Sequence, residues 1–248
     1  MRPGSTVLLC LLVALCGCPE GGAPWVGPAV RAAALCPADM VLVPGGVFLA
    51  GGTPDQVGIP PFVPDVPRDP RPPQQRTAAP FCIDRGEWQG GGASQAWVTW
   101  QQARVACRAQ GRRLCTEDEW SKACGGPLGW MRPYGPVHVA GLCHADVEQE
   151  GSYDAVLASG DLPGCASVYG ALDLEGNLSE WAEGRLAPPD PDAVMQQDPG
   201  SDETDFRMIL GGTMWPGVYG SGCQARHGHP PVAPVVGDDG FRCCRDTL

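Results

Sequence analysis

The stretch that decides the fold lies between residues 211 and 244. It opens with Gly211-Gly212-Thr213, continues with Cys223-Gln224-Ala225-Arg226, and closes with Gly240-Phe241-Arg242-Cys243-Cys244. The segment between the first two blocks reads Met-Trp-Pro-Gly-Val-Tyr-Gly-Ser-Gly and contains no cysteine. The stretch therefore offers cysteines for disulfides and arginines for buried ion pairs, but it has no closely spaced thiol pair before Cys223.

Four upstream segments have equally distinct patterns. Residues 40–52 read Met-Val-Leu-Val-Pro-Gly-Gly-Val-Phe-Leu-Ala-Gly-Gly, which predicts a strand, a turn and a strand. Residues 81–87 read Phe-Cys-Ile-Asp-Arg-Gly-Glu and predict another strand. Residues 113–120 read Arg-Leu-Cys-Thr-Glu-Asp-Glu-Trp, and residues 170–181 read Gly-Ala-Leu-Asp-Leu-Glu-Gly-Asn-Leu-Ser-Glu-Trp.

Two capping boxes predict two helices. Thr99 with Gln102 predicts a helix over 100–110, and Thr116 with Glu119 predicts one that reaches residue 124. Residues 53–80 carry nine prolines, each of which lacks a backbone donor, so we expect an extended surface loop there.

The five segments, in this order, resemble the formylglycine-generating enzymes, also called sulfatase-modifying factors. They are spread over residues 40–242, which is most of the chain. The resemblance implies an α+β fold that is irregular, loop-rich, disulfide-stapled and related to C-type lectins. We assign residues 36–248 to this domain.

Two departures set the chain apart from the family's enzymes. Their oxidase activity requires a cysteine pair that binds copper(I) as thiolates, and residues 214–222 supply no cysteine. Cys223 is the nearest catalytic candidate, but its Cys-x-x-Arg context matches a structural cysteine. Members also carry a helix after the strand that ends at Glu87, and here only a short glycine-rich segment follows. We therefore expect neither copper nor oxidase activity.

The composition excludes one class of partner. The formal net charge is −11, and Lys122 is the only lysine, so no basic patch is available for nucleic-acid phosphates. The chain has 35 glycines and 27 prolines, yet 43% apolar residues and eight tryptophans predict a packed, loop-rich domain.

The N-terminus predicts export. Arg2 precedes an apolar run over residues 7–15, which is too short to span a bilayer and is typical of a signal peptide over 1–17. Leu15-Cys16-Gly17-Cys18 resembles a bacterial lipobox, with Cys18 as the lipidated residue and 18–35 as a tether. The alternative is an ordinary signal peptide cut nearby. We expect a membrane-anchored lipoprotein of a bacterial cell envelope.

Ten cysteines remain for the exported domain, an even number that favours disulfides over a zinc site. The resemblance implies the pairs Cys107–Cys243 and Cys124–Cys223. Cys143 and Cys165 bracket a turn-rich loop and are expected to pair with each other. The sequence leaves the pairing of four cysteines open: Cys36, Cys82, Cys115 and Cys244.

The turn around Asn177 is the candidate metal site. The resemblance implies that it binds a structural Ca²⁺ through backbone carbonyls and the Glu180 carboxylate, which are hard oxygen ligands. The alternative is a turn in which Asn177 is left-handed and Glu180 makes a hydrogen bond. The candidate ligands are Glu175, Gly176, Asn177, Leu178 and Glu180.

The position of the missing cysteine pair is the candidate ligand cleft. Trp215, Tyr219 and Arg226 would line it, and the aromatic side chains would either bind a ligand or fill the cleft as core. Arg226 and Arg242 are expected to stabilise the fold. His227 and His229 form a His-x-His pair with no third metal ligand in view, so we expect an exposed loop there.

These observations favour a non-catalytic binding or structural domain at the cell envelope, with a peptide, protein or glycan partner. The alternative is a divergent formylglycine-generating oxidase, which converts a sulfatase cysteine to formylglycine, or another metal-dependent oxidase on this fold.

Overall fold

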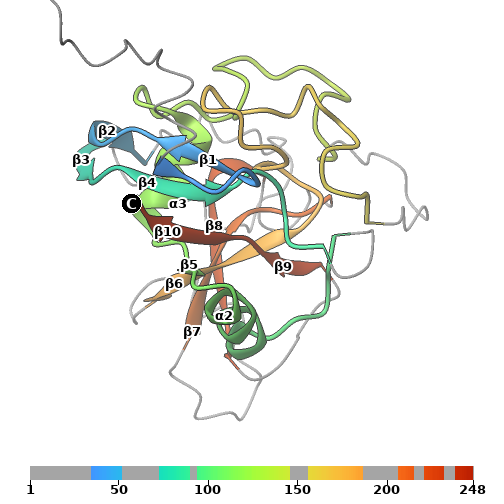
Figure 1. The fold of residues 1–248 in the computed structure, drawn as a ribbon. Helices are drawn as coiled ribbons and strands as arrows, with labels where there is room; N and C mark the ends of the chain where they lie inside the picture. Colours follow the sequence, from blue (N-terminus) through green and yellow to red (C-terminus); the bar gives the residue numbers. More distant parts are fainter. Residues whose placement is uncertain are drawn as a thin grey trace, which may run out of the picture.

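The protein is a mixed α+β domain with few helices, as the sequence predicts (Figure 1). The computed structural model describes residues 35–51, 73–89, 94–145, 156–186, 206–214, 221–231 and 238–247. Cys18, Trp215 and Tyr219 lie outside these residues, as do the predicted signal peptide and all but the last residue of the tether. The described elements are β1(Met40–Val43), β2(Gly46–Ala50), β3(Gln74–Ala78), β4(Phe81–Asp84), α2(Trp100–Ala109), β5(Arg113–Leu114), α3(Glu117–Gly125), β6(Ser179–Leu186), β7(Phe206–Gly211), β8(Gly222–His229), β9(Asp239–Phe241) and β10(Cys243–Asp246).

One four-stranded sheet joins the two ends of the domain. Its order is β1-β4-β10-β5, and all of its pairs are antiparallel. The last strand, β10, lies between β4 and β5, with Cys244 opposite Ile83 and Cys243 opposite Leu114. Every residue of β4 is buried, because the strand has a partner on each side.

A second four-stranded sheet has the order β8-β7-β6-β9 and lies beside the first in Figure 1. The β6–β9 pair is parallel, with Ser179 opposite Asp239, and the other pairs are antiparallel. The sheet therefore brings the 179–181 segment next to the Gly-Phe of the closing motif.

The prediction of an uninterrupted loop over 53–80 is wrong for its last part. Residues 74–78 form β3, which pairs in antiparallel register with β2. This stretch contains none of the nine prolines, so its backbone donors are available to a partner strand. The two strands predicted over 40–52 are present as β1 and β2, but they belong to different sheets.

Both predicted helices are confirmed, and each begins with a complete capping box. In α2 the Thr99 hydroxyl accepts from the Gln102 amide, and the Gln102 side chain accepts from the Thr99 amide. Thr116 and Glu119 make the same reciprocal pair at the start of α3. Among the described residues, no helix has the length and apolar character needed to cross a membrane.

Removing the α3 cap tests this local signal. Thr116→Ala deletes the hydroxyl that accepts from Glu119 N at 3.3 Å, so the free energy of unfolding should fall by about 1 kcal/mol. Thr116→Ser keeps the oxygen and should lose much less. Urea denaturation followed by circular dichroism measures both, and equal losses would contradict the capping role.

Five disulfides connect the ten cysteines that the structure describes. Three are the expected pairs Cys107–Cys243, Cys124–Cys223 and Cys143–Cys165. The pairs that the sequence left open are Cys36–Cys82 and Cys115–Cys244. Cys243 and Cys244 are neighbours on β10 and point to opposite faces of the sheet, so each reaches its own partner.

Three buried tryptophans hold the two sheets and helices together. Trp100 donates from Nε1 to the Ala182 carbonyl at 3.0 Å, and Trp181 donates to the Val98 carbonyl at 2.7 Å. Trp120 packs in the larger core cluster and donates to Glu180 at 2.7 Å. Each large apolar ring therefore keeps its N–H paired, which removes the cost of burying it.

Candidate functional site

The position of the missing cysteine pair is partly described. Thr213 and Met214 follow β7 and are buried, and β8 begins at Gly222. Arg226 lies on β8 opposite Leu210 and is half-buried. Of the three residues predicted to line a ligand cleft, Arg226 is therefore the one that the structure describes.

Cys223 does not provide a thiol. It is 1% exposed and bonded to Cys124 at the end of α3, which agrees with the structural cysteine that its Cys-x-x-Arg context indicates. A disulfide sulfur cannot act as a thiolate ligand or nucleophile until it is reduced. All ten described cysteines are oxidised in the same way.

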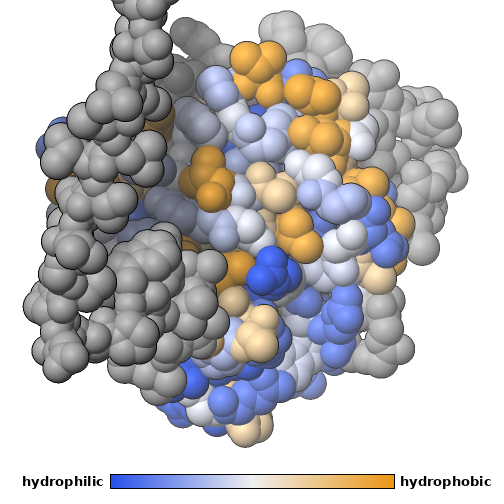
Figure 2. Space-filling view, turned by 45° about the horizontal axis from the view of Figure 1, so that its top comes forward, coloured by the Kyte–Doolittle hydropathy of each residue, from blue (hydrophilic) through white to orange (hydrophobic). Residues whose placement is uncertain are grey.

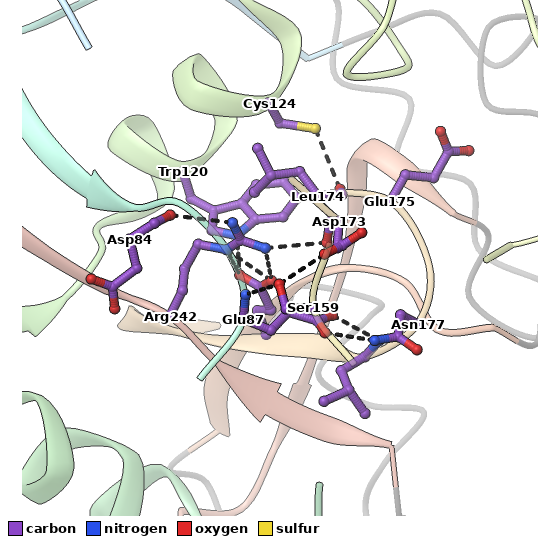
Figure 3. Close-up of polar contacts among 12 residues, drawn as sticks. Asp84, Glu87, Trp120, Cys124, Ser159, Asp173, Leu174, Glu175, Asn177 and Arg242 are labelled. Carbon is purple, nitrogen blue, oxygen red and sulfur yellow. Dashed lines mark hydrogen bonds and ion pairs between the residues drawn. The ribbon is translucent and has the colours of Figure 1, made fainter. Parts of the chain in front are cut away.

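A buried polar network around Arg242 lies where the two sheets meet (Figure 3). Arg242 is 1% exposed, and its Nε and Nη2 donate to the Glu180 carboxylate at 2.6–2.9 Å. Its guanidinium also donates to the backbone carbonyls of Asp84 at 3.4 Å and Asp173 at 3.2 Å. This confirms the expectation that Arg242 stabilises the fold through an acidic partner.

The side chains of three predicted calcium ligands bind other protein groups. Both Glu180 oxygens accept from Arg242, and Oε2 also accepts from Trp120. The Asn177 amide oxygen accepts from Leu157 N at 2.9 Å, and Glu175 is paired with Arg132. Among the side-chain oxygens of Glu175, Asn177 and Glu180, Oε2 of Glu175 is the one that is buried with no hydrogen-bond partner among the described groups. The Glu180 carboxylate is therefore bound by Arg242 and Trp120, and the calcium site stays a prediction.

The turn alternative agrees with the geometry. Asn177 has a φ of +56°, in the left-handed region that asparagine tolerates better than most residues. Gly176 has a φ of +76°, and a Cβ there would lie 2.2 Å from the His144 carbonyl oxygen. The Asn177 side chain donates to Glu87 at 2.6 Å and to the Leu157 carbonyl at 3.3 Å. The conformation and hydrogen bonds of this turn therefore account for its residues.

Glu87 connects the turn to the network. Its carboxylate accepts from Asn177 Nδ2 and from Leu178 N at 3.2 Å, and its backbone N–H donates to Ser159. Burial, and next the nearby charge of Glu180, raise the pKa of Glu87 to about 8. A buried carboxylic acid at neutral pH is the consequence.

This raised pKa predicts a pH dependence of stability. The ordinary pKa is 4.5, so between pH 4.5 and 8 the folded state keeps a proton that the unfolded state loses. The resulting stability is complete below pH 4.5 and is lost as the pH rises towards 8. Between pH 6.5 and 8, the wild-type free energy of unfolding should fall by about 1 kcal/mol per pH unit more than that of Glu87→Gln.

Urea denaturation at several pH values measures this difference. The range above pH 6.5 is chosen because burial raises the pKa of Asp84 only to about 6, so Asp84 is mostly ionised there. If the free energy of unfolding changes with pH in the same way for the wild type and for Glu87→Gln, Glu87 is ionised in the folded state.

A polar cleft of about 350 Å³ opens beside the network. Arg112 lies in it and donates to Asp39 at 2.6 Å and to Asp84. Glu87 and Trp88 also line it. The principal charges of the cleft therefore already bind one another.

The prediction that His227 and His229 lie on an exposed loop is wrong. Both are on β8 and buried, with 2% and 0% of their surface exposed. Asp239, at the start of β9, lies beside them with its Oδ2 2.9 Å from His229 Nδ1. Burial lowers the pKa of His227, so its ring is neutral. Sequence reasoning missed Asp239, although it directly precedes the Gly-Phe-Arg motif.

The family model of the sulfatase-modifying factor enzyme 1-like domain matches residues 94–247 of this chain. The chain belongs to this family. The match contains the described helices α2 and α3, the described strands β5 to β10, and the Arg242 network apart from Asp84 and Glu87.

A bovine relative, described as inactive C-alpha-formylglycine-generating enzyme 2, is 30% identical over 104 residues. This match covers 38% of the present chain and 34% of the bovine protein, so it spans about a third of that relative.

Solved structures share the fold of this sulfatase-modifying factor domain. PvdO from Pseudomonas aeruginosa has a TM-score of 0.60 at 19% identity and covers 84% of this chain and 94% of its own. CarF has a TM-score of 0.59 at 17% identity, and the match covers 85% of this chain and 98% of CarF. Treponema denticola variable protein 1 has a TM-score of 0.60 at 14% identity and covers 84% and 94%. At these identities the likeness shows the fold alone.

Proposed function

We propose that this protein is an exported, lipid-anchored sulfatase-modifying factor domain that acts as a non-catalytic binding or structural module at a bacterial cell envelope. One observation carries the non-catalytic part. Cys223 is bonded to Cys124, and residues 214–222 contain no cysteine. The thiolate pair that copper(I) chemistry requires in this family therefore has no residues to form it.

A count of free thiols together with bound copper tests this proposal. Mature protein from an oxidising compartment should show no free thiol, bind no copper(I), and consume no oxygen with a cysteine-containing sulfatase peptide. Cys124→Ala is the matched control, because it should release one thiol at Cys223 and show that the assay detects it. Copper binding with oxygen consumption by the wild type would support the oxidase instead.

The envelope location rests on the N-terminal sequence. Residues 7–15 and the Leu-x-Gly-Cys pattern ending at Cys18 support a signal peptide followed by lipidation. Expression of the full chain in a bacterial host should place it in the detergent phase with a diacylglyceryl mass increment. Cys18→Ala should move it to the aqueous phase, and equal partitioning of both proteins would contradict the anchor.

The binding role concerns a peptide, protein or glycan partner. The net charge of −11 disfavours a nucleic acid. On the described part of the face in Figure 2, apolar side chains lie in several groups separated by hydrophilic ones. This mixed character favours a polar or amphipathic partner over a wholly apolar one. In the part of the chain that the structure describes, the exposed large apolar residues are Val47, Trp97, Val105, Leu128, Val137, Val139 and Val168.

A further inference from the structure

A cluster of three metal-ligating residues lies in the core, apart from the cleft and the predicted calcium turn. It consists of His227, His229 and Asp239, which each offer one ligand atom within 4.8 Å of the other two. Their exposed fractions are 2%, 0% and 0%. Three residues of these types in one buried place are a chemical feature that hydrophobic packing does not require.

The fold brings the cluster together in two steps. His227 and His229 are two residues apart on β8, so the strand directs both rings to the same side, and their centroids lie 4.9 Å apart. Asp239 begins β9, which is the opposite outer strand in the order β8-β7-β6-β9. The 2.9 Å contact between His229 Nδ1 and Asp239 Oδ2 joins side chains of these two outer strands.

Part of the ligating capacity of the cluster is unused. His229 Nε2 and Asp239 Oδ1 are buried and have no hydrogen-bond partner among the described groups. Buried polar atoms in native proteins are almost always paired, so two orphaned atoms on adjoining residues require an explanation. The contacting pair, His229 Nδ1 and Asp239 Oδ2, is 2.9 Å apart, a separation typical of two ligands of one ion, and a cation accepts electron pairs from imidazole nitrogen and carboxylate oxygen together.

We propose that His227, His229 and Asp239 bind one divalent transition-metal ion. Two imidazoles and one carboxylate suit zinc or iron(II), whereas calcium prefers oxygen ligands alone. A metal–nitrogen bond of about 2.1 Å places neighbouring ligand atoms roughly 3–3.5 Å apart, which the 4.8 Å limit accommodates. The single carboxylate leaves the site with one negative charge, which a divalent cation more than compensates. Trp181, whose ring centroid is 6.1 Å from that of His229, forms part of its apolar surround.

The site does not depend on the proposed non-catalytic function, since it contains no sulfur and lies outside residues 214–222. Metal binding would also explain why two histidines are buried at positions where apolar side chains would pack as well. The sequence contains four histidines, and the remaining two are His138 and His144.

Zinc binding by the tag-free mature protein tests the proposal. After chelation and dialysis, calorimetry with Zn²⁺ alone should give one site per chain, and the thermal midpoint should rise with Zn²⁺. His227→Gln and His229→Gln should each weaken zinc binding at least about 100-fold, because changes to second-shell groups alone cost 10–100-fold. His138→Gln, an exposed histidine, is the matched control and should bind as the wild type does.

A spectroscopic measurement covers the case in which the buried variants fail to fold. X-ray absorption at the zinc edge of the wild-type complex should show two imidazole ligands, with oxygen completing the shell. Absence of zinc binding by the wild type, fewer than two imidazole ligands, or folded His227→Gln and His229→Gln proteins that bind zinc unchanged would each overturn the site.

Discussion

Replacing Cys107, Cys115, Cys243 and Cys244 together by alanine should lower the free energy of unfolding by about 6 kcal/mol. The two bonds that are lost join β10 to α2 and to the residue after β5. The Cys124–Cys223 bond remains in this variant. It already shortens the path between Cys115 and Cys244 to a loop of about 30 residues, so each lost bond contributes less stability than its sequence separation suggests. A loss of this size is comparable to the whole stability of many domains.

Single removals provide a sharper test. With Cys115–Cys244 in place, Cys107–Cys243 closes a loop of only about nine residues, and its loss should cost about 2.6 kcal/mol. Cys143–Cys165, with a separation of 22, should cost about 3.4 kcal/mol. The bond with the separation of 136 should therefore matter less than the one with 22. Guanidinium denaturation of the paired alanine variants decides this order, and the reverse order would show that the two β10 bonds act independently.

Arg242→Met should lower the free energy of unfolding by about 3–5 kcal/mol, because it leaves the Glu180 carboxylate buried without its cationic partner. The guanidinium also donates to the backbone carbonyls of Asp84 and Asp173, so the substitution leaves these two acceptors without that donor. The expected result is a large fall in the urea midpoint with an unchanged slope.

The double variant Glu180→Gln with Arg242→Met separates the ion pair from packing. The amide oxygen of glutamine still accepts from Trp120 Nε1, but it carries no charge to be left unpaired. The double variant should therefore be more stable than Arg242→Met alone, which makes the coupling energy of the cycle measurable. If Glu180→Gln adds further destabilisation to Arg242→Met, the carboxylate has other compensation and the ion-pair account is wrong.

Local patterns in the sequence predicted local structure well. Thr99 and Thr116 determine where the helices begin, because a capping box involves groups only three residues apart. The strand over 81–84 and the strands over 40–43 and 46–50 also follow from short apolar patterns. Residues 74–78 were missed because their strand character depends on β2, which lies far away in the sequence.

The candidate site shows the same division. The resemblance implied Cys107–Cys243 and Cys124–Cys223, and it implied a structural role for Arg242. The partner of Glu180 was left open, because a Gly-Asn turn has the same sequence whether its carboxylate binds a cation or an arginine 62 residues away. The third member of the histidine cluster was missed for a related reason, since Asp239 belongs to a different strand from His227 and His229.

The sequence by itself determined the family, the two helices, three of the disulfide pairs and the absence of cysteine between Thr213 and Cys223, because covalent composition and short-range spacing specify these features. Only the tertiary structure decided that Cys36 pairs with Cys82 and Cys115 with Cys244. It also decided that Glu180 faces Arg242 and that two histidines on one edge of a sheet meet an aspartate on the other. These contacts join segments that are distant in the sequence. Buried charged and polar groups need partners, and only the folded chain brings these partners within reach of one another.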